Sequence, residues 1–105
     1  MSEVLRSIEL RAREIADQWG ILLTSLLGHG IDGNVWQTSR HSALKVFVRN
    51  DTYVRERDCY RRLLENSVRR LAGFAVPQLL DFDNRFMAIE MTIVTPPCLL
   101  DFGKA

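Results

Sequence analysis

The sequence has few of the residues that build disulfide frameworks, clustered metal sites or membrane spans. Its 105 residues include two cysteines, Cys59 and Cys98, too few and too far apart to indicate a disulfide scaffold or a four-cysteine metal site. The longest apolar stretch near the start, residues 21–27, is interrupted by Thr24 and Ser25 and falls far short of the ~20 residues that cross a bilayer. We therefore expect a cytoplasmic protein with no signal peptide and no membrane helix.

A strong charge of either sign is also absent. The formal net charge is +1 at pH 7, so the chain as a whole has no field that would attract nucleic acid or a membrane surface. Arginines are frequent between residues 55 and 70, but Glu56, Asp58 and Glu65 are interspersed with them. This mixture favours a solvated helix face over a nucleic-acid patch, and we expect neither nucleic acid nor membrane as a partner.

The composition that remains is that of an ordinary globular domain. Hydrophobic residues make up 47% of the chain and charged residues 26%, which excludes a disordered or fibrous protein. A length of 105 residues suits one compact domain, because single domains most often contain about 100 to 150 residues.

The segment 1–20 has the pattern of an amphipathic helix. Apolar residues recur at helical spacing (Val4, Ile8, Ala12, Ile15, Trp19), and Gly20 stands where the helix would end. Such a helix packs most simply on its own domain. A helix that binds a partner is the alternative.

Strand patterns and one long helix follow from residue 21 onward. The expected strands are residues 22–27, 34–38, 42–48, 78–82 and 86–93. The expected helix runs from Thr52 to Leu71, with caps offered by Asn50 and Asp51. These segments predict an α+β fold: a twisted antiparallel sheet of about five strands, one long packed helix and an added N-terminal helix.

A glycine-rich string lies between the first two expected strands. Residues 28–35 read G-x-G-x-x-G-x-V, a spacing that lets backbone N–H groups approach phosphate oxygens without hindrance from a Cβ atom. The same glycines can open a dinucleotide-binding unit, but that motif needs a helix directly after them. Because the strand 34–38 follows here, we disfavour that interpretation; a purely structural turn is the other alternative.

Two charged residues stand in apolar surroundings after this string. Lys45 lies amid the apolar strand 42–48, where alternation places Ala43, Lys45 and Phe47 on one face, and it is one of only two lysines. A compact ammonium suits a phosphate ligand, although a lysine at the edge of a strand can also extend its head into water. Glu56 falls on the apolar stripe of the long helix and needs a partner if it is buried. Lys45 is the obvious candidate, and Tyr60, Arg49 or solvent are alternatives.

Together, the glycine string, the strand lysine, the helix glutamate and the following strands resemble the small lobe of protein kinases. The resemblance covers roughly residues 21–94 and implies roles in ATP binding. It implies that Gly28, Gly30 and Gly33 cover the phosphates, that Val35 and Ala43 enclose the adenine, and that Lys45 holds the phosphates and pairs with Glu56. It further implies that Ile89 is the gatekeeper and that the backbone of Glu90 and Thr92 contacts the adenine.

The sequence also departs from the family. It contains no His-Arg-Asp catalytic loop, which supplies the aspartate that receives the substrate proton. Residues 101–103 nevertheless read Asp-Phe-Gly, which resembles the metal-binding segment of kinases and implies that Asp101 supports Mg²⁺. A shrunken kinase-like protein, a truncated product and a chance match all account for this tail.

We therefore expect an ATP-binding, kinase-like domain over residues 21–95, preceded by the helix 1–20 and followed by the tail 96–105. The expected role is that of a pseudokinase, a regulatory piece or a fragment of a Ser/Thr-type kinase, with little phosphotransfer of its own. The alternative is an interaction module that kept the fold and lost the nucleotide. Such a module would use its exposed apolar surface to form a homodimer or to bind a partner kinase.

Overall fold

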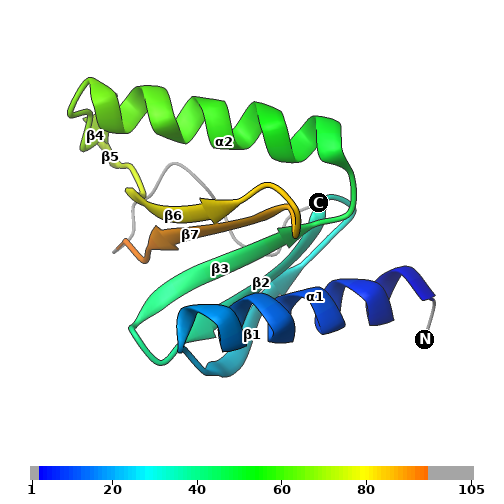
Figure 1. The fold of residues 1–105 in the computed structure, drawn as a ribbon. Helices are drawn as coiled ribbons and strands as arrows, with labels where there is room; N and C mark the ends of the chain where they lie inside the picture. Colours follow the sequence, from blue (N-terminus) through cyan, green and yellow to red (C-terminus); the bar gives the residue numbers. More distant parts are fainter. Residues whose placement is uncertain (1–2, 95–105) are drawn as a thin grey trace.

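A computed structural model describes the backbone of residues 3–94 and the side chains from residue 7 onward. Two helices and seven strands follow one another along this part of the chain (Figure 1). Their bounds are α1 Glu3–Trp19, β1 Leu23–His29, β2 Gly33–Thr38, β3 Ser42–Phe47, α2 Asn50–Glu65, β4 Arg70–Leu71, β5 Phe74–Ala75, β6 Leu79–Asp83 and β7 Ala88–Thr92. The α+β fold predicted from the sequence is confirmed.

The main sheet has five strands in the order β1-β2-β3-β7-β6, and every neighbouring pair is antiparallel. Strand β3 is central, so Lys45 lies opposite Val35 of β2 on one side and Ile89 of β7 on the other. Because side chains directly opposite one another in a sheet share a face, this register places these three residues on one face.

The two faces of the sheet carry separate hydrophobic cores, one beneath each helix (Figure 1). Beneath α2, Tyr53 and Tyr60 pack with a cluster of sheet residues (Val35, Ala43, Phe47, Leu79, Ile89, Met91). Beneath α1, three fully buried helix residues (Ile8, Ala12, Ile15) pack with Leu44, Val46, Phe86 and Ala88. Each large apolar side chain buried in this way contributes about 1.5 to 3 kcal/mol. The N-terminal helix thus packs on its own domain, as the sequence favoured.

Helix α1 ends through a glycine, as predicted. Gly20 has φ +69°, its N–H donates to the carbonyl oxygen of Asp17 at 3.2 Å, and the N–H of Ile21 donates to that of Ala16 at 2.9 Å. This pair of bonds is the Schellman arrangement, in which glycine occupies the left-handed position because it has no Cβ atom.

Helix α2 is shorter than the sequence predicted, and the expected extension to Leu71 is wrong. Its last residue is Glu65, and Ser67 adopts φ +55° while Val68 donates to the Leu63 carbonyl at 2.8 Å. This is the same type of helix end as in α1, but with serine in the left-handed position. The N-cap residue is Arg49, without a side-chain cap bond, so neither Asn50 nor Asp51 caps the helix as expected.

The residues after α2 form a small β hairpin instead of helix. Strands β4 and β5 pair through Arg70–Ala75 and Leu71–Phe74, and Ala72 and Gly73 connect them with φ values of +51° and +83°. Two consecutive residues with positive φ are typical of the type I′ turn that matches the twist of a hairpin. Gly73 therefore serves a turn between strands and not a helix end.

Candidate functional site

Lys45 and Glu56 form an ion pair between β3 and α2. The Lys45 Nζ atom lies 3.1 and 3.2 Å from the two carboxylate oxygens of Glu56, and 4.6 Å from the centre of the Phe47 ring. The two side chains are 19% and 26% exposed, so the pair is shielded on most sides but still reached by solvent. The contact predicted between the strand lysine and the helix glutamate is therefore present; its role in binding a nucleotide stays a prediction.

The elements that carry this pair explain why it forms. Strand alternation turns Lys45 toward α2, and the buried Tyr53 and Tyr60 hold the helix on the same face of the sheet. Glu56 lies one turn after Tyr53 and one turn before Tyr60, on the helix side that faces the sheet. The charged pair thus stands at the margin of a hydrophobic core.

Val35 and Ala43 lie on the same sheet face as Lys45. Val35 is directly opposite Lys45, and Ala43 precedes it by two positions on β3. The structure therefore brings four predicted site residues together: Val35, Ala43, Lys45 and Glu56. Val35 is buried and Ala43 is 0% exposed, so a ligand can contact them only if this part of the face becomes accessible.

The glycine-rich string forms a tight hairpin turn between β1 and β2. The N–H of Gly30 donates to the carbonyl oxygen of Gly33 at 3.0 Å, and the N–H of Val48 donates to that of Asp32 at 2.9 Å. The second bond attaches the turn to the end of β3. Gly28 belongs to β1, where it pairs with Val35.

Gly33 has a structural reason to be glycine. Its φ is +152°, and a Cβ atom built on it would lie 2.1 Å from the carbonyl oxygen of Val46 and 3.0 Å from the Cα atom of Phe47. Close packing of β2 against β3 thus excludes any larger residue. This steric reason accounts for glycine at position 33, and contact of Gly28, Gly30 and Gly33 with phosphates stays a prediction.

Glu90 does not fit the adenine contact inferred from the sequence. Its backbone lies within β7, between Leu44 of β3 and Asp81 of β6, so it is enclosed by strands on both sides. Its side chain shares the α1 face of the sheet with Leu44, opposite to the face of Lys45. We therefore set Glu90 aside as a nucleotide contact.

The Glu90 carboxylate instead belongs to a buried polar network that the sequence did not reveal. It is 2% exposed and accepts hydrogen bonds from Arg40 Nη2 at 2.7 Å and from Ser42 Oγ at 2.5 Å. The Ser42 hydroxyl also lies 2.5 Å from that of Thr38. The signal in the sequence was a glutamate within an apolar strand, and this does not identify Arg40, in the distant β2–β3 turn, as its partner.

Thr92, the second predicted hinge residue, ends β7 and already uses its N–H group. That N–H donates to the carbonyl oxygen of Gln78 at 2.9 Å, and the Thr92 hydroxyl accepts from the N–H of Gln78 at 2.9 Å. Ile89, the predicted gatekeeper, lies opposite Lys45 and is fully buried. A contact between adenine and the Thr92 backbone stays a prediction.

Asp101 and the tail 96–105 lie outside the described residues. Within residues 3–94, no three histidine, cysteine or acidic side chains come together as a metal site. In that same part of the chain, neither helix is long and apolar enough to cross a membrane.

The buried hydroxyl of Tyr60 has no hydrogen-bond partner among the described residues. Burial raises the pKa of this phenol, and the nearby Glu56 carboxylate raises it further. Burial also raises the pKa of Tyr53, but the Tyr53 hydroxyl donates to Asn84 Oδ1 at 2.6 Å.

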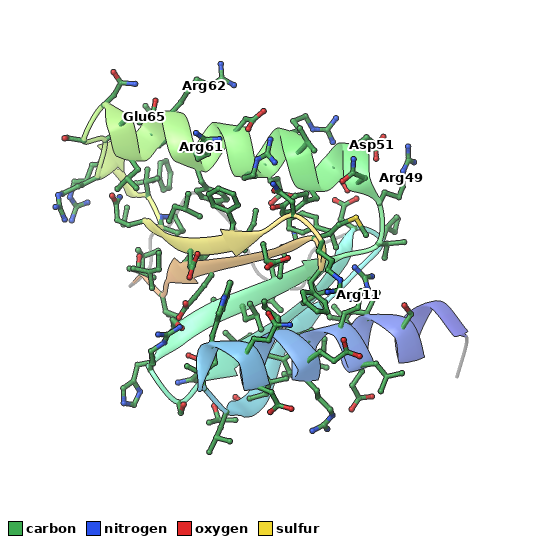
Figure 2. All side chains as sticks on the ribbon, in the orientation of Figure 1. Arg11, Arg49, Asp51, Arg61, Arg62 and Glu65 are labelled. Carbon is green, nitrogen blue, oxygen red and sulfur yellow. The ribbon has the colours of Figure 1, made fainter. Side chains whose placement is uncertain are left out.

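Two hollows adjoin the C-terminal half of α2, and neither is lined by Lys45 or Glu56. Figure 2 shows Arg61, Arg62 and Glu65 near the C-terminal end of this helix. The polar hollow, of about 400 Å³, is lined by Asp58, Arg61, Arg62 and Glu65. The second, of about 260 Å³, reaches β6 and is lined by Arg61, Leu64, Glu65, Leu79, Leu80, Asp81 and Phe82. Neither hollow was predicted from the sequence.

Comparison with known proteins finds the fold in kinase-like enzymes. The sequence matches no protein-family model and no curated protein. Among solved structures, the gentamicin complex of APH(2")-IIa superposes with a TM-score of 0.59 at 22% identity, over 80% of this chain and 27% of that one. The ADP-bound aminoglycoside phosphotransferase APH(2'')-Ib gives a TM-score of 0.60 at 19% identity, over 82% and 28%.

A streptomycin–ATP ternary complex of APH(2")-IIa gives a TM-score of 0.57 at 20% identity, over 80% of this chain and 27% of that one. The chain thus spans little more than a quarter of the length of these structures. At such identities the similarity establishes the fold alone, and the chain has a kinase small-lobe-like fold.

Proposed function

We propose that this chain is an ATP-binding module. The observation that carries the proposal is the Lys45–Glu56 pair, at 3.1 Å, in a kinase small-lobe-like fold. A lysine ammonium on a rigid central strand is a compact charge suited to phosphate oxygens. Glu56 orients it, because a bidentate contact restricts the rotamers of a long flexible side chain.

Nucleotide complexes among the solved neighbours support this proposal. One of these structures is ADP-bound and another is a complex with ATP. Both share the kinase small-lobe-like fold of this chain. Contact of the phosphates with Gly28 and Gly30, and of the adenine with Val35, Ala43 and Thr92, belongs to the same proposal. Mg²⁺ enters it only through Asp101.

We assign no phosphotransfer to the residues of this chain by themselves. The printed sequence has no His-Arg-Asp loop to receive a proton from an acceptor. The proposed role is therefore that of a pseudokinase or regulatory nucleotide-binding piece, or of the nucleotide-binding portion of a larger enzyme.

Calorimetry with ATP, ADP and adenosine tests the proposal. We expect ATP to bind at or below millimolar concentration, and Lys45→Met to weaken ATP at least tenfold while adenosine changes little, because only the phosphate contact is removed. Arg62→Met is the matched control, since it removes an exposed cation from the outer side of α2. The proposal fails if none of the three ligands binds at millimolar concentration.

The metal part of the proposal is tested separately. If Asp101 supports Mg²⁺, the metal strengthens ATP binding in the unmodified protein but not in Asp101→Asn, because magnesium prefers a carboxylate together with phosphate oxygens. Equal enhancement of both proteins would show that Asp101 is no ligand.

An interaction module is the second candidate, favoured by exposed apolar side chains. Leu64, Leu71, Phe74 and Leu80 are each more than 40% exposed, and Figure 1 shows the β4–β5 hairpin beside the C-terminal end of α2. Exposed apolar surface of this kind is common at interfaces. Sedimentation across a concentration series tests self-association, and a strict monomer at the highest concentration would argue against a homodimer.

A further inference from the structure

Asn84 connects the β6–β7 turn to helix α2. Its Oδ1 atom accepts a hydrogen bond from the Tyr53 hydroxyl at 2.6 Å and a second from Arg57 Nη1 at 2.8 Å. One side-chain oxygen outside the helix thus holds two side chains on successive turns of α2.

The arginine in this arrangement is itself held in place. Its Nε and Nη2 atoms donate to Asp58 Oδ1 at 3.1 and 2.9 Å, and its guanidinium lies 5.5 Å from the Tyr53 ring centre and 5.8 Å from that of Phe82. The Arg57 side chain is only 16% exposed. The bond to Asn84 therefore comes from an arginine packed against two aromatic rings, and it reaches an exposed residue of the β6–β7 turn.

Helix geometry relates these contacts to the candidate site. At about 100° per residue, Glu56 projects roughly 60° to one side of Tyr53, and Arg57 roughly 40° to the other. Lys45 holds α2 on the Glu56 flank, and Asn84 holds it on the Arg57 flank. A rotation of α2 about its axis would disturb both contacts, so the two anchors together define the rotational setting of the helix.

We propose that Asn84 is a positioning residue that holds α2 in the rotational setting where Glu56 meets Lys45, and so controls how well the site receives phosphate groups. This inference rests on the proposed nucleotide-binding function. Asn84 itself contacts no ligand in this proposal, and it acts through Tyr53 and Arg57.

Nucleotide affinities give the first test. We expect Asn84→Ala to weaken ATP about tenfold, a typical cost of losing a residue that orients a ligand-binding group, while the affinity for adenosine changes less than twofold. Asn84→Asp should restore ATP binding, because its carboxylate accepts both bonds. Asn66→Ala is the matched control: the Asn66 side chain bonds only the Arg62 carbonyl, at the other end of α2. Equal losses for ATP and adenosine, or no rescue by aspartate, would overturn the proposal.

A double-mutant cycle gives a test that needs no nucleotide. Asn84 and Glu56 share no hydrogen-bond partner, so Asn84→Ala and Glu56→Gln should add in urea unfolding if they act independently. We expect them to be non-additive, with Asn84→Ala reducing the cost of losing Glu56. If the protein binds no nucleotide, the proposed function fails and this cycle alone decides: additive effects overturn the role of Asn84. Should Asn84→Ala not fold, Tyr53→Phe, which removes one of the two bonds, takes its place in both tests.

Discussion

Arg11 of helix α1 closes over the end of the sheet by donating to the backbone oxygen of Phe86 at 2.9 Å. The same guanidinium donates to the oxygen of Phe47 at 2.8 Å, and Figure 2 shows Arg11 reaching from α1 toward the sheet. One arginine thus joins the N-terminal helix to the last residue of β3 and to the loop before β7. Partial burial lowers the pKa of this guanidinium, but an arginine remains charged.

Arg11→Met should lower the free energy of unfolding by about 1 to 3 kcal/mol, because two carbonyl oxygens lose a charged donor. Arg13→Met, on the same helix, is the control. Arg13 is 65% exposed and forms an i,i+4 pair with Glu9, and exposed pairs of this kind contribute little. Urea unfolding measures the free energy of unfolding of both variants. Similar losses for the two would contradict a stabilising role for the Arg11 contacts.

Gly33→Ala should be far more damaging than an alanine substitution at Gly20. Both glycines have positive φ, but a Cβ atom on Gly33 meets the Val46 oxygen at 2.1 Å, whereas a Cβ atom on Gly20 has no neighbour within 4 Å. Gly20→Ala should cost about 1 to 2 kcal/mol, which is backbone strain alone. Gly33→Ala should cost more, because β2 must also shift relative to β3 to make room for the methyl group. Thermal unfolding compares the stability of the two variants. An equal loss of stability would mean that the sheet adjusts freely around Gly33.

Tyr60→Phe should stabilise the protein, because it removes a buried hydroxyl that has no hydrogen-bond partner in the described part of the chain. Such an unsatisfied group costs about 1 to 3 kcal/mol, so we expect a gain of about 1 kcal/mol at pH 7. Tyr53→Phe is the contrasting variant, because it removes the hydrogen bond to Asn84 and should destabilise.

The same residue predicts a pH dependence. Burial raises the pKa of Tyr60 in the folded state, above the ordinary value of about 10 for an unfolded chain. The folded state therefore retains its proton longer, and the stability from this group is complete below about pH 10 and is lost as the pH rises toward the folded pKa. Tyr60→Phe should flatten the loss of stability above pH 10. The free energy of unfolding, measured in urea as a function of pH, should therefore differ between the two proteins above pH 10. Parallel pH curves would contradict the raised pKa of Tyr60.

The buried Glu90 carboxylate makes Arg40 important for stability despite its exposed position. Arg40→Ala leaves a negative charge in the sheet with Ser42 as its remaining donor, and loss of one partner of a buried pair costs up to about 3 to 5 kcal/mol. Because the Arg40 side chain is half exposed, we expect about 1 to 3 kcal/mol in urea unfolding. Arg49→Ala, which breaks an exposed pair with Asp51, is the control and should change little.

Local patterns in the sequence predicted much of the fold. Alternation around Lys45 identified the face that carries Ala43 and Phe47, and the helical spacing before Gly20 identified α1. These features depend on residues within a few positions of one another, where periodicity reports directly on which side is buried.

The features that the sequence did not predict depend on contacts between distant segments. The left-handed conformation of Ser67 is not favoured by serine itself, so the true end of α2 and the hairpin after it were missed. The role of Glu90 depends on which residue of β7 lies opposite Leu44. A strand can be recognised without its register, and a shift of one residue would move Glu90 to the other face.

The strand order β1-β2-β3-β7-β6 also has a kinetic consequence. Strands β1 to β3 pair with their neighbours in the chain and can form from short hairpins, which close on a microsecond scale. Strands β6 and β7 also pair as a hairpin, but the pairing of β7 with β3, which places Ala88 opposite Val46, closes a loop of roughly forty residues that includes α2, at a larger entropic cost. We therefore expect the approach of β7 to β3, which also assembles the surroundings of Lys45, to be a late step in folding, so that the candidate site is completed only when it occurs.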